Sequence, residues 1–321
     1  MVTLLPYKIA VEQKISELTF PKNPENLYEP IRYFLSLGGK RMRPVLLLIG
    51  HELFGGKKED AVSAAVAIEI FHNFSLVHDD IMDKAALRRG KATVHEKWNT
   101  NTAILSGDAM LIEAYKLLAE RSTPHLKTVL DIFNKTALEV CEGQVLDMDF
   151  EIRNDVTIEE YLNMIRLKTA VLLGGSLKIG ALLANASEKD AESVYQFGMH
   201  LGIAFQLQDD ILDAYGDPEK FGKTPGGDIA ANKKTFLLLK TQELCSPQDK
   251  KHLESLMFFY HENKVEQVLA LYAKYKVREM AEKEMEGHYR TALGKLSGIH
   301  APEEKKKSLE AIAAFLMGRE S

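Results

Sequence analysis

Apolar residues recur along most of this chain with the three-to-four-residue spacing of an amphipathic helix. This spacing predicts helices over residues 9–18, 25–37, 45–54, 57–83, 102–120, 126–150, 158–184, 194–215, 236–243, 247–262, 265–293 and 302–318. No stretch alternates apolar and polar positions long enough to predict a convincing strand. The pattern therefore predicts an all-α fold of roughly ten to thirteen helices.

Few positions interrupt this pattern. Pro30 lies inside the second range, so regular helix is expected to begin only at Glu29. The pair Gly174-Gly175, which follows Lys168-Thr169, invites a kink. Neither a repeat of 20–50 residues nor a linker-like stretch is visible. We therefore expect residues 1–321 to form a single domain.

The composition is that of a globular protein, with 45% hydrophobic and 27% charged residues. The net charge of −5, without a basic stripe, argues against nucleic-acid binding. Two cysteines in unrelated contexts exclude a disulfide framework and favour a cytoplasmic location. No signal peptide is visible, and Lys178 interrupts the most apolar stretch, so no transmembrane segment is expected.

The pattern Asp-Asp-x-x-Asp occurs twice within predicted helices. The first copy is Asp79-Asp80-Ile81-Met82-Asp83, and the second is Asp209-Asp210-Ile211-Leu212-Asp213. Residues four apart on a helix share a face, with Cβ atoms roughly 5–6 Å apart. The outer aspartates of each copy therefore repel each other in the absence of a cation. A solvated acidic face is the alternative for one copy, but two identical spacings beside apolar runs favour a metal site.

Carboxylates without Cys or His suit Mg²⁺ or Mn²⁺ rather than zinc. Mg²⁺ bound by few carboxylates usually completes its shell with water and substrate phosphates. The motifs therefore predict a phosphate-bearing substrate held by Mg²⁺ between two helices. Because the chain has no Gly-rich Walker loop, P-loop nucleotide chemistry is not expected.

Basic residues accompany both motifs. They are Lys40, Arg43, Arg88, Arg89, Lys168, Lys223 and Lys233. Arginine binds phosphate oxygens in a bidentate manner, although a solvated basic loop is the alternative for each segment alone. So much positive charge fits two polyphosphate groups, or one polyphosphate and a leaving diphosphate. With the apolar and aromatic residues nearby, including Phe71 and Phe74, it predicts a hydrocarbon chain that carries a diphosphate.

These residues resemble the trans-isoprenyl diphosphate synthases of the polyprenyl synthetase family, over nearly the whole chain. Besides both acidic motifs, the matching segments are Gly39-Lys40-Arg41-Met42-Arg43-Pro44, His72, Arg88-Arg89-Gly90, Lys168-Thr169, Phe205-Gln206-Leu207-Gln208 and Gly222-Lys223. The resemblance implies a homodimer of helical bundles around a deep central cavity. It also implies head-to-tail condensation of isopentenyl diphosphate with an allylic diphosphate, in which the allylic diphosphate ionises and a proton is finally lost to the departing diphosphate.

The resemblance further implies residue roles. Asp79, Asp83 and Asp209 bind three Mg²⁺ ions, with Mn²⁺ as a substitute, while Asp80, Asp210 and Asp213 support them mainly from the outer sphere. The residues implied for the allylic diphosphate are Arg88, Lys168, Thr169, Gln206, Lys223 and Lys233. Those implied for isopentenyl diphosphate are Lys40, Arg43, His72 and Arg89. The candidate catalytic residues are Asp79, Asp83, Arg88, Lys168, Asp209 and Lys223.

Some of these assignments stay open. Lys233 is preferred over its neighbour Lys234 without a decisive reason. A histidine such as His72, on a partly buried helix face, is often structural. Asn232 stands where the family usually has glycine.

Product length is expected to depend on Phe71 and Phe74. Phe74 lies five residues before Asp79, about 7.5 Å along a helix axis, and Phe71 about 12 Å. Ordinary core packing is the alternative for both. If they line the cavity that holds the growing hydrocarbon chain, they form its floor and limit product length. The resemblance then favours geranylgeranyl diphosphate over farnesyl diphosphate, because Ser75 is not aromatic and the first motif has no insertion.

Three other functions are considered. A class I terpene cyclase shares the first motif but needs no isopentenyl site. The doublet His78-Asp79 mimics helical metal phosphohydrolases, which need further histidine ligands. A non-catalytic subunit of a heteromeric synthase commonly loses an acidic motif, whereas both are intact here.

Overall fold

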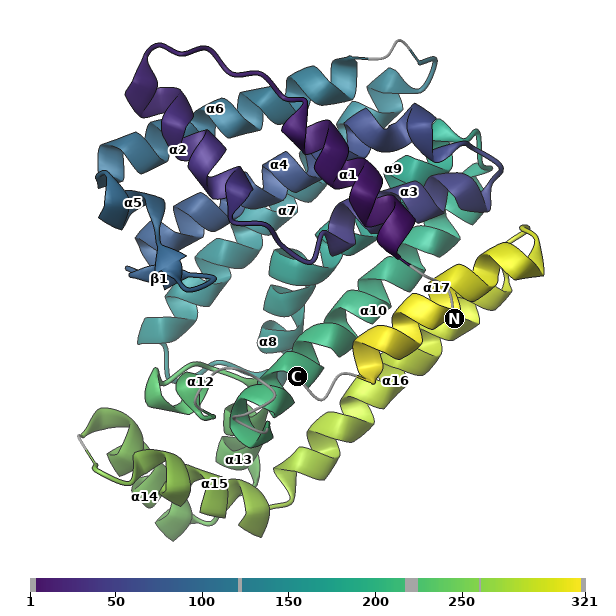
Figure 1. Ribbon diagram of the computed structural model, residues 1–321. Helices are drawn as coiled ribbons and strands as arrows, with labels where there is room; N and C mark the ends of the chain where they lie inside the picture. Colours follow the sequence, from purple (N-terminus) through teal and green to yellow (C-terminus); the bar gives the residue numbers. More distant parts are fainter. Residues whose placement is uncertain (1–3, 121–122, 217–224, 260, 319–321) are drawn as a thin grey trace. The chain divides into compact units, whose positions relative to one another are not determined.

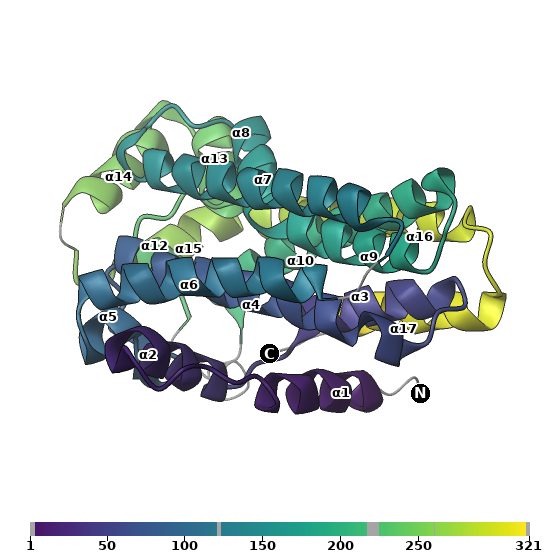
Figure 2. The ribbon, with the colours of Figure 1, turned by 90° about the horizontal axis from the view of Figure 1, so that it is seen from above.

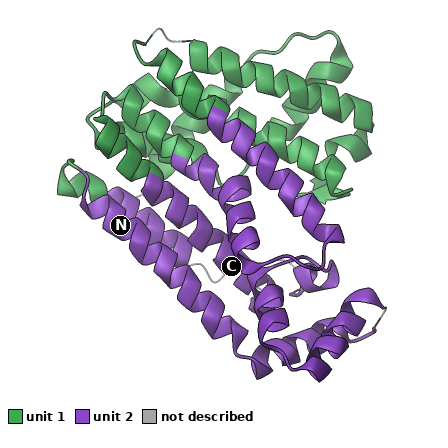
Figure 3. Ribbon diagram, turned by 180° about the vertical axis from the view of Figure 1, so that it is seen from behind, with its two compact units in different colours: residues 1–134, 175–195, 300–306 green, residues 135–174, 196–299, 307–321 purple. Residues whose placement is uncertain are grey.

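The computed structural model describes residues 4–120, 123–216, 225–259 and 261–318. These residues are helical almost throughout, and their only strands form one short hairpin (Figure 1). The all-α class expected from the sequence is confirmed. The chain divides into two compact units, which we describe separately (Figure 3). Unit 1 comprises Met1–Asn134, Gly175–Tyr195 and His300–Lys306, and unit 2 comprises Lys135–Gly174, Gln196–Ile299 and Lys307–Ser321. The expected single domain and central cavity stay predictions.

Unit 1 contains most of the early elements. They are α1 (Leu5–Ser16), α2 (Glu25–Ser36), α3 (Met42–Leu53), α4 (Lys58–Met82), β1 (Leu87–Arg88), β2 (Lys91–Ala92), α5 (Val94–Lys97) and α6 (Thr100–Ala119). α4 packs against both α3 and α6 (Figures 1 and 2). Small residues in its first half allow this burial on several sides, and Ala65, Val66 and Ala67 are fully buried. The first acidic motif therefore ends a helix that the core of unit 1 holds firmly.

Unit 2 contains most of the later elements. They are α8 (Ile158–Ile165), the π-helix η1 (Arg166–Ala170), α12 (Gly227–Ala230), α13 (Phe236–Leu244), α14 (Pro247–Phe258), α15 (Lys264–Lys274) and α16 (Val277–Ser297). The helices α7 (Leu126–Ile152), α9 (Val171–Leu183), α10 (Glu188–Tyr215) and α17 (Glu303–Met317) contribute residues to both units. A capping box of Thr157 and Glu160 fixes the start of α8.

Two glycines bring α3 and α9 into close contact within unit 1. A Cβ atom at Gly50 would lie 2.7 Å from the carbonyl oxygen of Leu177. One at Gly180 would lie 2.1 Å from the carbonyl oxygen of Leu47. Both distances are shorter than van der Waals contact, so a larger residue at either position would push the helices apart.

The structure corrects three expectations about the helices. α2 is already helical at Glu25 and continues through Pro30, because the burial of neighbours such as Phe34 offsets the hydrogen bond that proline cannot donate. The expected helix 265–293 is two helices, separated at Lys276, whose φ of 53° is left-handed. The loop expected after the first motif contains the hairpin β1–β2, in which Arg88 pairs with Lys91.

Among the described residues, α4 is one helix long and apolar enough to cross a membrane by length and composition alone. Of its most apolar 18-residue window, 61% is buried inside the protein. Such burial is typical of a core helix in a globular fold.

Candidate active site

The first acidic motif occupies the C-terminal end of α4. Asp79 and Asp80 lie in its last turn and Asp83 is its C-cap, whose N–H donates to the carbonyl oxygen of Asp79 at 2.8 Å. The second motif likewise ends α10, which terminates at Tyr215. The C-terminal end of a helix carries partial negative charge, so carboxylates are unfavourable there and cations are favoured. Both placements therefore fit sites for a positive ligand.

Asp80 is held by an arginine. It is 1% exposed, and Arg88 Nε lies 2.8 and 2.9 Å from its two carboxylate oxygens, with Arg88 Nη2 at 2.7 Å from Oδ1. Burial raises the pKa of Asp80, and the Arg88 guanidinium counteracts it. Because this contact occupies both oxygens, Asp80 fits a supporting role better than that of a metal ligand.

The hairpin β1–β2 positions Arg88 for this contact. Its turn residues Arg89 and Gly90 both have positive φ, 54° and 74°, as in the tight turns that suit β-hairpins. The Arg89 guanidinium lies against Gly39, where an added Cβ would approach Arg89 Nη2 to 3.1 Å. The segment Arg88-Arg89-Gly90 and the segment that begins at Gly39, both of which resemble the family, are therefore in contact within unit 1.

Arg43 and His72 form a second basic element in unit 1. Arg43 Nη1 lies 3.0 Å from His72 Nε2. Burial, followed by the charges of Arg43, Arg89, Arg88 and Arg41, lowers the pKa of His72 well below its ordinary value. His72 is therefore neutral at pH 7, and its Nε2 can accept the hydrogen bond from Arg43.

Arg41, between Lys40 and Arg43, has a structural role. Its side chain is buried and bonds to Glu69 at 2.6 Å and to Glu12 at 2.9 Å. It also donates to the carbonyl oxygen of Leu35. Arg41 thus ties α1, α2 and α4 to the start of α3, and Lys40 is an exposed residue beside it.

The second motif uses different partners. Asp210 is 5% exposed and accepts a short hydrogen bond from Tyr161 Oη and a second one from Gln206 Nε2 at 3.1 Å. Burial and the charge of Asp228 raise the pKa of Asp210 to about 7. Asp213 Oδ2 accepts the N–H of Asp228 at 2.9 Å. Asp209 is half-buried on the same helix.

The pair Lys168-Thr169 lies inside the π-helix η1. The regular α-helix is therefore interrupted at these residues, before Gly174-Gly175. Lys168 Nζ bonds to Asp147 at 2.5 Å, and Thr169 Oγ1 bonds to Gln206 Oε1 at 3.2 Å.

Two glycines make room for this π-helix. A Cβ at Gly143 would lie 2.3 Å from the backbone nitrogen of Lys168, and one at Gly202 would lie 2.6 Å from Cα of Ala170. Neighbouring helices thus approach the widened turn from both flanks, as is frequent at functional sites.

A small cavity of about 50 Å³ collects these groups in unit 2. It is lined by Asp147, Tyr161, Met164, Ile165, Lys168, Thr169, Gln206, Asp210, Lys233, Lys234 and Thr235. Four predicted site residues, Lys168, Thr169, Gln206 and Lys233, therefore come together. Lys233 Nζ also lies 3.9 Å from Asp228 Oδ1. Lys223 lies outside the described residues.

Asn232 precedes Lys233 and has a φ of 58°. Glycine adopts this left-handed conformation readily and asparagine is among the residues that tolerate it. This explains how Asn232 can replace the usual glycine.

Sequence reasoning missed three residues of unit 2. Tyr161 and Asp147 hold Asp210 and Lys168, respectively. Gln144 is 7% exposed, and neither of its side-chain amide atoms has a hydrogen-bond partner among the described residues. The spacing of Gln144 and Asp147, directly after Gly143 on one helix, was a signal that could have drawn attention to them.

Phe71 and Phe74 belong to an aromatic cluster in unit 1. Their ring centroids are 5.7 Å apart. Phe71 is 1% exposed and packs edge-on against Phe133 at 5.2 Å, which packs against Tyr115 at 5.1 Å. Phe74 is half-buried and contacts the His78 ring at 4.7 Å. The rings thus continue from Phe74 deeper into the core.

His78 does not resemble a metal ligand. Its Nε2 lies 3.1 Å from the carbonyl oxygen of Ile104, a bond that is possible because Gly107 leaves room for the ring. Within the described ranges, no three His, Cys, Asp or Glu side chains cluster as a metal site. The contact of His78 with Ile104 disfavours the phosphohydrolase alternative, which needs histidine ligands.

Several known proteins resemble this chain in sequence. A model of the polyprenyl synthetase family matches residues 24–275. A short chain isoprenyl diphosphate synthase of Methanothermobacter thermautotrophicus is 36% identical over 321 residues, which cover 100% of this chain and 98% of that protein. A geranylgeranyl diphosphate synthase of Sulfolobus acidocaldarius is 40% identical over 304 residues, 91% of each chain.

A solved geranylgeranyl pyrophosphate synthase superposes with a TM-score of 0.94 at 45% identity, over 100% of both chains. These relatives are transferases, and the resemblance drawn from the sequence is confirmed. The chain belongs to the polyprenyl synthetase family.

Proposed function

We propose that the protein condenses isopentenyl diphosphate with an allylic diphosphate, head to tail and in trans, and that geranylgeranyl diphosphate is its main product. The observation that carries this proposal is the intact pair of acidic motifs, each at a helix C-terminus and each accompanied by cations within its own unit. The relatives named for geranylgeranyl diphosphate support the product.

Asp79, Asp83 and Asp209 are the proposed Mg²⁺ ligands. Bound Mg²⁺ would neutralise charge on the departing diphosphate, and three ions are expected as in the family. Asp80 and Asp210 act indirectly, because Arg88 and Tyr161 already bond to their carboxylates. Asp213 also acts indirectly, since it positions Asp228.

The cations divide between two diphosphates. Arg88, Lys168, Lys223 and Lys233 would bind the allylic diphosphate and stabilise the charge that develops as it leaves. Lys40, Arg43, His72 and Arg89 would bind isopentenyl diphosphate. The neutral His72 contributes a hydrogen-bonding ring and no charge, which leaves Arg43 and Arg89 as the anchors.

The π-helix and α10 each provide a polar oxygen that would lie near the reacting carbons. Thr169 Oγ1 and Gln206 Oε1 lie 3.2 Å apart at the small cavity of unit 2. Their dipoles would favour the positive allylic carbon, and the proton released after the new bond forms would pass to the departing diphosphate. An unchanged rate in Thr169→Ala would contradict this role.

Product length would be limited by Phe74 and Phe71. Phe74 is the half-buried member, and Phe71 supports it from the core. The double variant Phe71→Ala/Phe74→Ala should lengthen the product, because the floor recedes. Dephosphorylated products would be sized by chromatography. The same product size in the double variant would contradict the floor.

The activity is tested by incubating the protein with Mg²⁺, labelled isopentenyl diphosphate and, separately, dimethylallyl, geranyl and farnesyl diphosphate. Elongated prenyl alcohols that disappear with EDTA and in Asp79→Ala would support the synthase. A hydrocarbon product with diphosphate release would support a terpene cyclase. The absence of both would support a non-catalytic subunit.

We also propose a homodimer in the cytoplasm. α6 exposes Ile104, Leu105 and Ile112, at 41%, 59% and 62% exposure. So many large apolar side chains on one exposed helix indicate a protein contact. Light scattering should give twice the chain mass for the native protein, and Ile112→Asp should shift it towards the monomer. A native monomer would contradict the proposal.

A further inference from the structure

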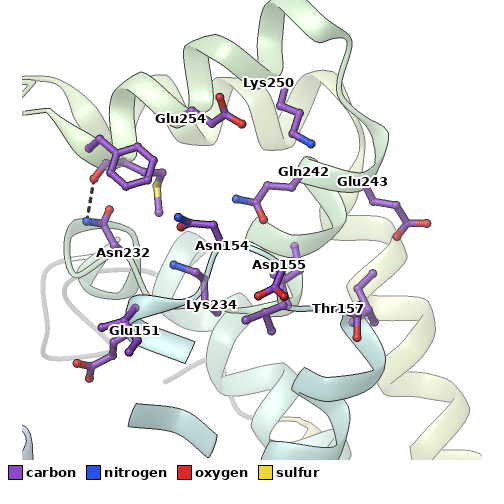
Figure 4. Close-up of a pocket in the computed structure, with 16 residues that line it drawn as sticks. Glu151, Asn154, Asp155, Thr157, Asn232, Lys234, Gln242, Glu243, Lys250 and Glu254 are labelled. Atoms are coloured by element: carbon purple, nitrogen blue, oxygen red, sulfur yellow. Dashed lines mark hydrogen bonds between the residues drawn. The ribbon is translucent and has the colours of Figure 1, made fainter. Parts of the chain in front are cut away.

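A cavity of about 730 Å³ lies in unit 2, outside the residues assigned to the two diphosphates (Figure 4). Its walls come from the end of α7, the segment 154–157, the start of α8, and from α13 and α14. Cavities of roughly 300–1,000 Å³ are typical of small-molecule sites. The cavity is therefore large enough to hold a small-molecule ligand.

Two lysines and four carboxylates line this cavity, and Lys234 is the least exposed of them. Six charged residues line the cavity, and five of them, Glu151, Asp155, Glu243, Lys250 and Glu254, are exposed to solvent. Asp155 already pairs with Arg153 at 2.8 Å, and Glu243 with Lys240 at 2.9 Å. Lys234 alone among the six is half-buried.

The Lys234 amine lacks a counter-ion within the described part of the chain. Burial alone lowers the pKa of this lysine, and no carboxylate of that part counteracts it. A partly desolvated ammonium without a negative partner is unfavourable. An anion in the cavity would relieve that cost.

Neutral polar groups accompany the lysine. Figure 4 shows Lys234, Asn154 and Gln242 directed towards the middle of the cavity, whereas Glu151 and Glu243 point away from it. Asn232 is already engaged, since it donates to the carbonyl oxygen of Met257 at 3.0 Å. Asn154 and Gln242 are therefore the amides placed to donate to a ligand.

Apolar side chains also line the cavity. Leu239, Met257 and Phe258 are among them. Phe258 is 65% exposed, although it is a large aromatic residue. An apolar ligand body packed there would remove this surface from water.

We propose that this cavity is a second ligand site for a small amphipathic anion. The anionic oxygens of the ligand, of a phosphate or a carboxylate, bond to Lys234, Asn154 and Gln242. Its short apolar body packs against Leu239, Met257 and Phe258.

A ligand bound in this cavity would influence the synthase reaction through residues 233–235. Lys234 lines both this cavity and, with its neighbours Lys233 and Thr235, the small cavity beside Asp210. A bound anion that moves Lys234 would move Lys233 with it. This part rests on the proposed function, because it concerns the allylic diphosphate that Lys233 would bind. The expected effect is a change of about threefold or more in the KM for that substrate.

Calorimetric titration tests the binding itself. Geranyl monophosphate and geranate serve as probes with one apolar body and two different heads. Both are titrated with Mg²⁺ and saturating inorganic diphosphate, which competes for the diphosphate sites. At least one probe should bind with 1:1 stoichiometry, and the head that binds distinguishes a phosphate from a carboxylate ligand.

Three variants locate the site. Lys234→Met should weaken binding at least tenfold, and Gln242→Trp, which fills the cavity, should abolish it. Lys251→Met, an exposed lysine of α14 outside the cavity wall, should leave binding unchanged. Circular dichroism would establish that each variant is folded. Absence of binding by both probes, or equal binding in folded Lys234→Met and Gln242→Trp, would overturn the proposal.

The kinetic effect is read separately. The probe should change the KM for the allylic diphosphate in the native protein and not in Gln242→Trp. An equal change in both would overturn the link to Lys233. If the protein had no synthase activity, the titrations would still decide whether the site exists, so the two failures are distinguishable.

Discussion

The two acidic motifs share the same spacing but use their middle aspartates differently. In unit 1, Asp80 faces the guanidinium of Arg88 and is held by a charged partner. In unit 2, Asp210 faces the hydroxyl of Tyr161 and the amide of Gln206, both neutral donors. Burial and the charge of Asp228 raise the pKa of Asp210 to about 7, because neutral donors offset less of the cost of burying a carboxylate than a charged partner does.

This difference indicates that the motifs do not carry the same charge. Asp80 with Arg88 forms a pair of zero net charge, which leaves Asp79 and Asp83 as the proposed metal ligands of this motif. The raised pKa of Asp210, about 7, favours its protonated form near neutral pH when no cation is bound. The second motif can thus lower its own negative charge, whereas the first is balanced by a fixed cation.

The largest effect on kcat is expected when an outer aspartate of either motif is replaced. The two motifs should lose activity to the same extent. Asp79→Ala and Asp209→Ala should each lower kcat at least about 1,000-fold, or about 4 kcal/mol, because diphosphate cannot leave without charge neutralisation. Steady-state kinetics with farnesyl diphosphate would measure this. Asp131→Ala, at an exposed position on α7, is the matched control and should keep its rate. A small effect at one motif would show that the reaction depends on the other alone.

The next largest effect is a difference between the two motifs in how protein stability depends on pH, measured in the absence of Mg²⁺. The folded-state pKa of Asp210, about 7, lies above the unfolded value of about 4, so the native state binds the extra proton. The free energy of unfolding should therefore fall as the pH rises from 5 to 7.5, by about 2–3 kcal/mol from this group. Urea unfolding of the native protein and Asp210→Asn would measure this.

The Asp210→Asn variant should lose most of that decline. Asp249→Asn is the control, because the pKa of Asp249 is lowered to about 2 and this group stays ionised across the same range. An unchanged pH slope in Asp210→Asn would mean that Asp210 is ionised like Asp80.

The smallest effects concern the partners. Arg88→Met leaves Asp80 buried without its counter-ion and also removes a phosphate contact, so kcat should fall about 30-fold. Tyr161→Phe removes one neutral donor and keeps the ring, so a fall of about fivefold is expected. Kinetics at several pH values would also show the rate profile of Tyr161→Phe shifted to higher pH. Equal losses of kcat in both variants, without a shift of the pH–rate profile, would mean that a charged and a neutral partner act alike in the two motifs.

Most helices could be predicted from the sequence because each helix buries a periodic apolar face. The irregular positions within them could not be predicted, because some depend on contacts between segments that are distant in the sequence. The π-helix at Lys168 depends on the close approach of Gly143 and Gly202, which no local pattern reveals. The break at Lys276 has neither glycine nor proline to mark it.

The candidate site shows the same limit. The aspartates and most cations could be predicted because identical spacings recur and basic residues flank them. Tyr161 and Asp147 were missed because a tyrosine or aspartate on an amphipathic helix looks ordinary until its partner is known. Arg41 lies in the sequence between Lys40 and Arg43, which are predicted to bind phosphate, but it is itself buried against Glu69 and Glu12.

Arg41 has a practical consequence for protein engineering. One guanidinium joins α1 through Glu12, α2 through Leu35 and α4 through Glu69. A shortened protein that begins after α1 would lack Glu12 and leave part of a buried cation unsatisfied. Purification tags and fusions are therefore best placed ahead of Leu5, and a shortened enzyme needs a compensating change at residue 41.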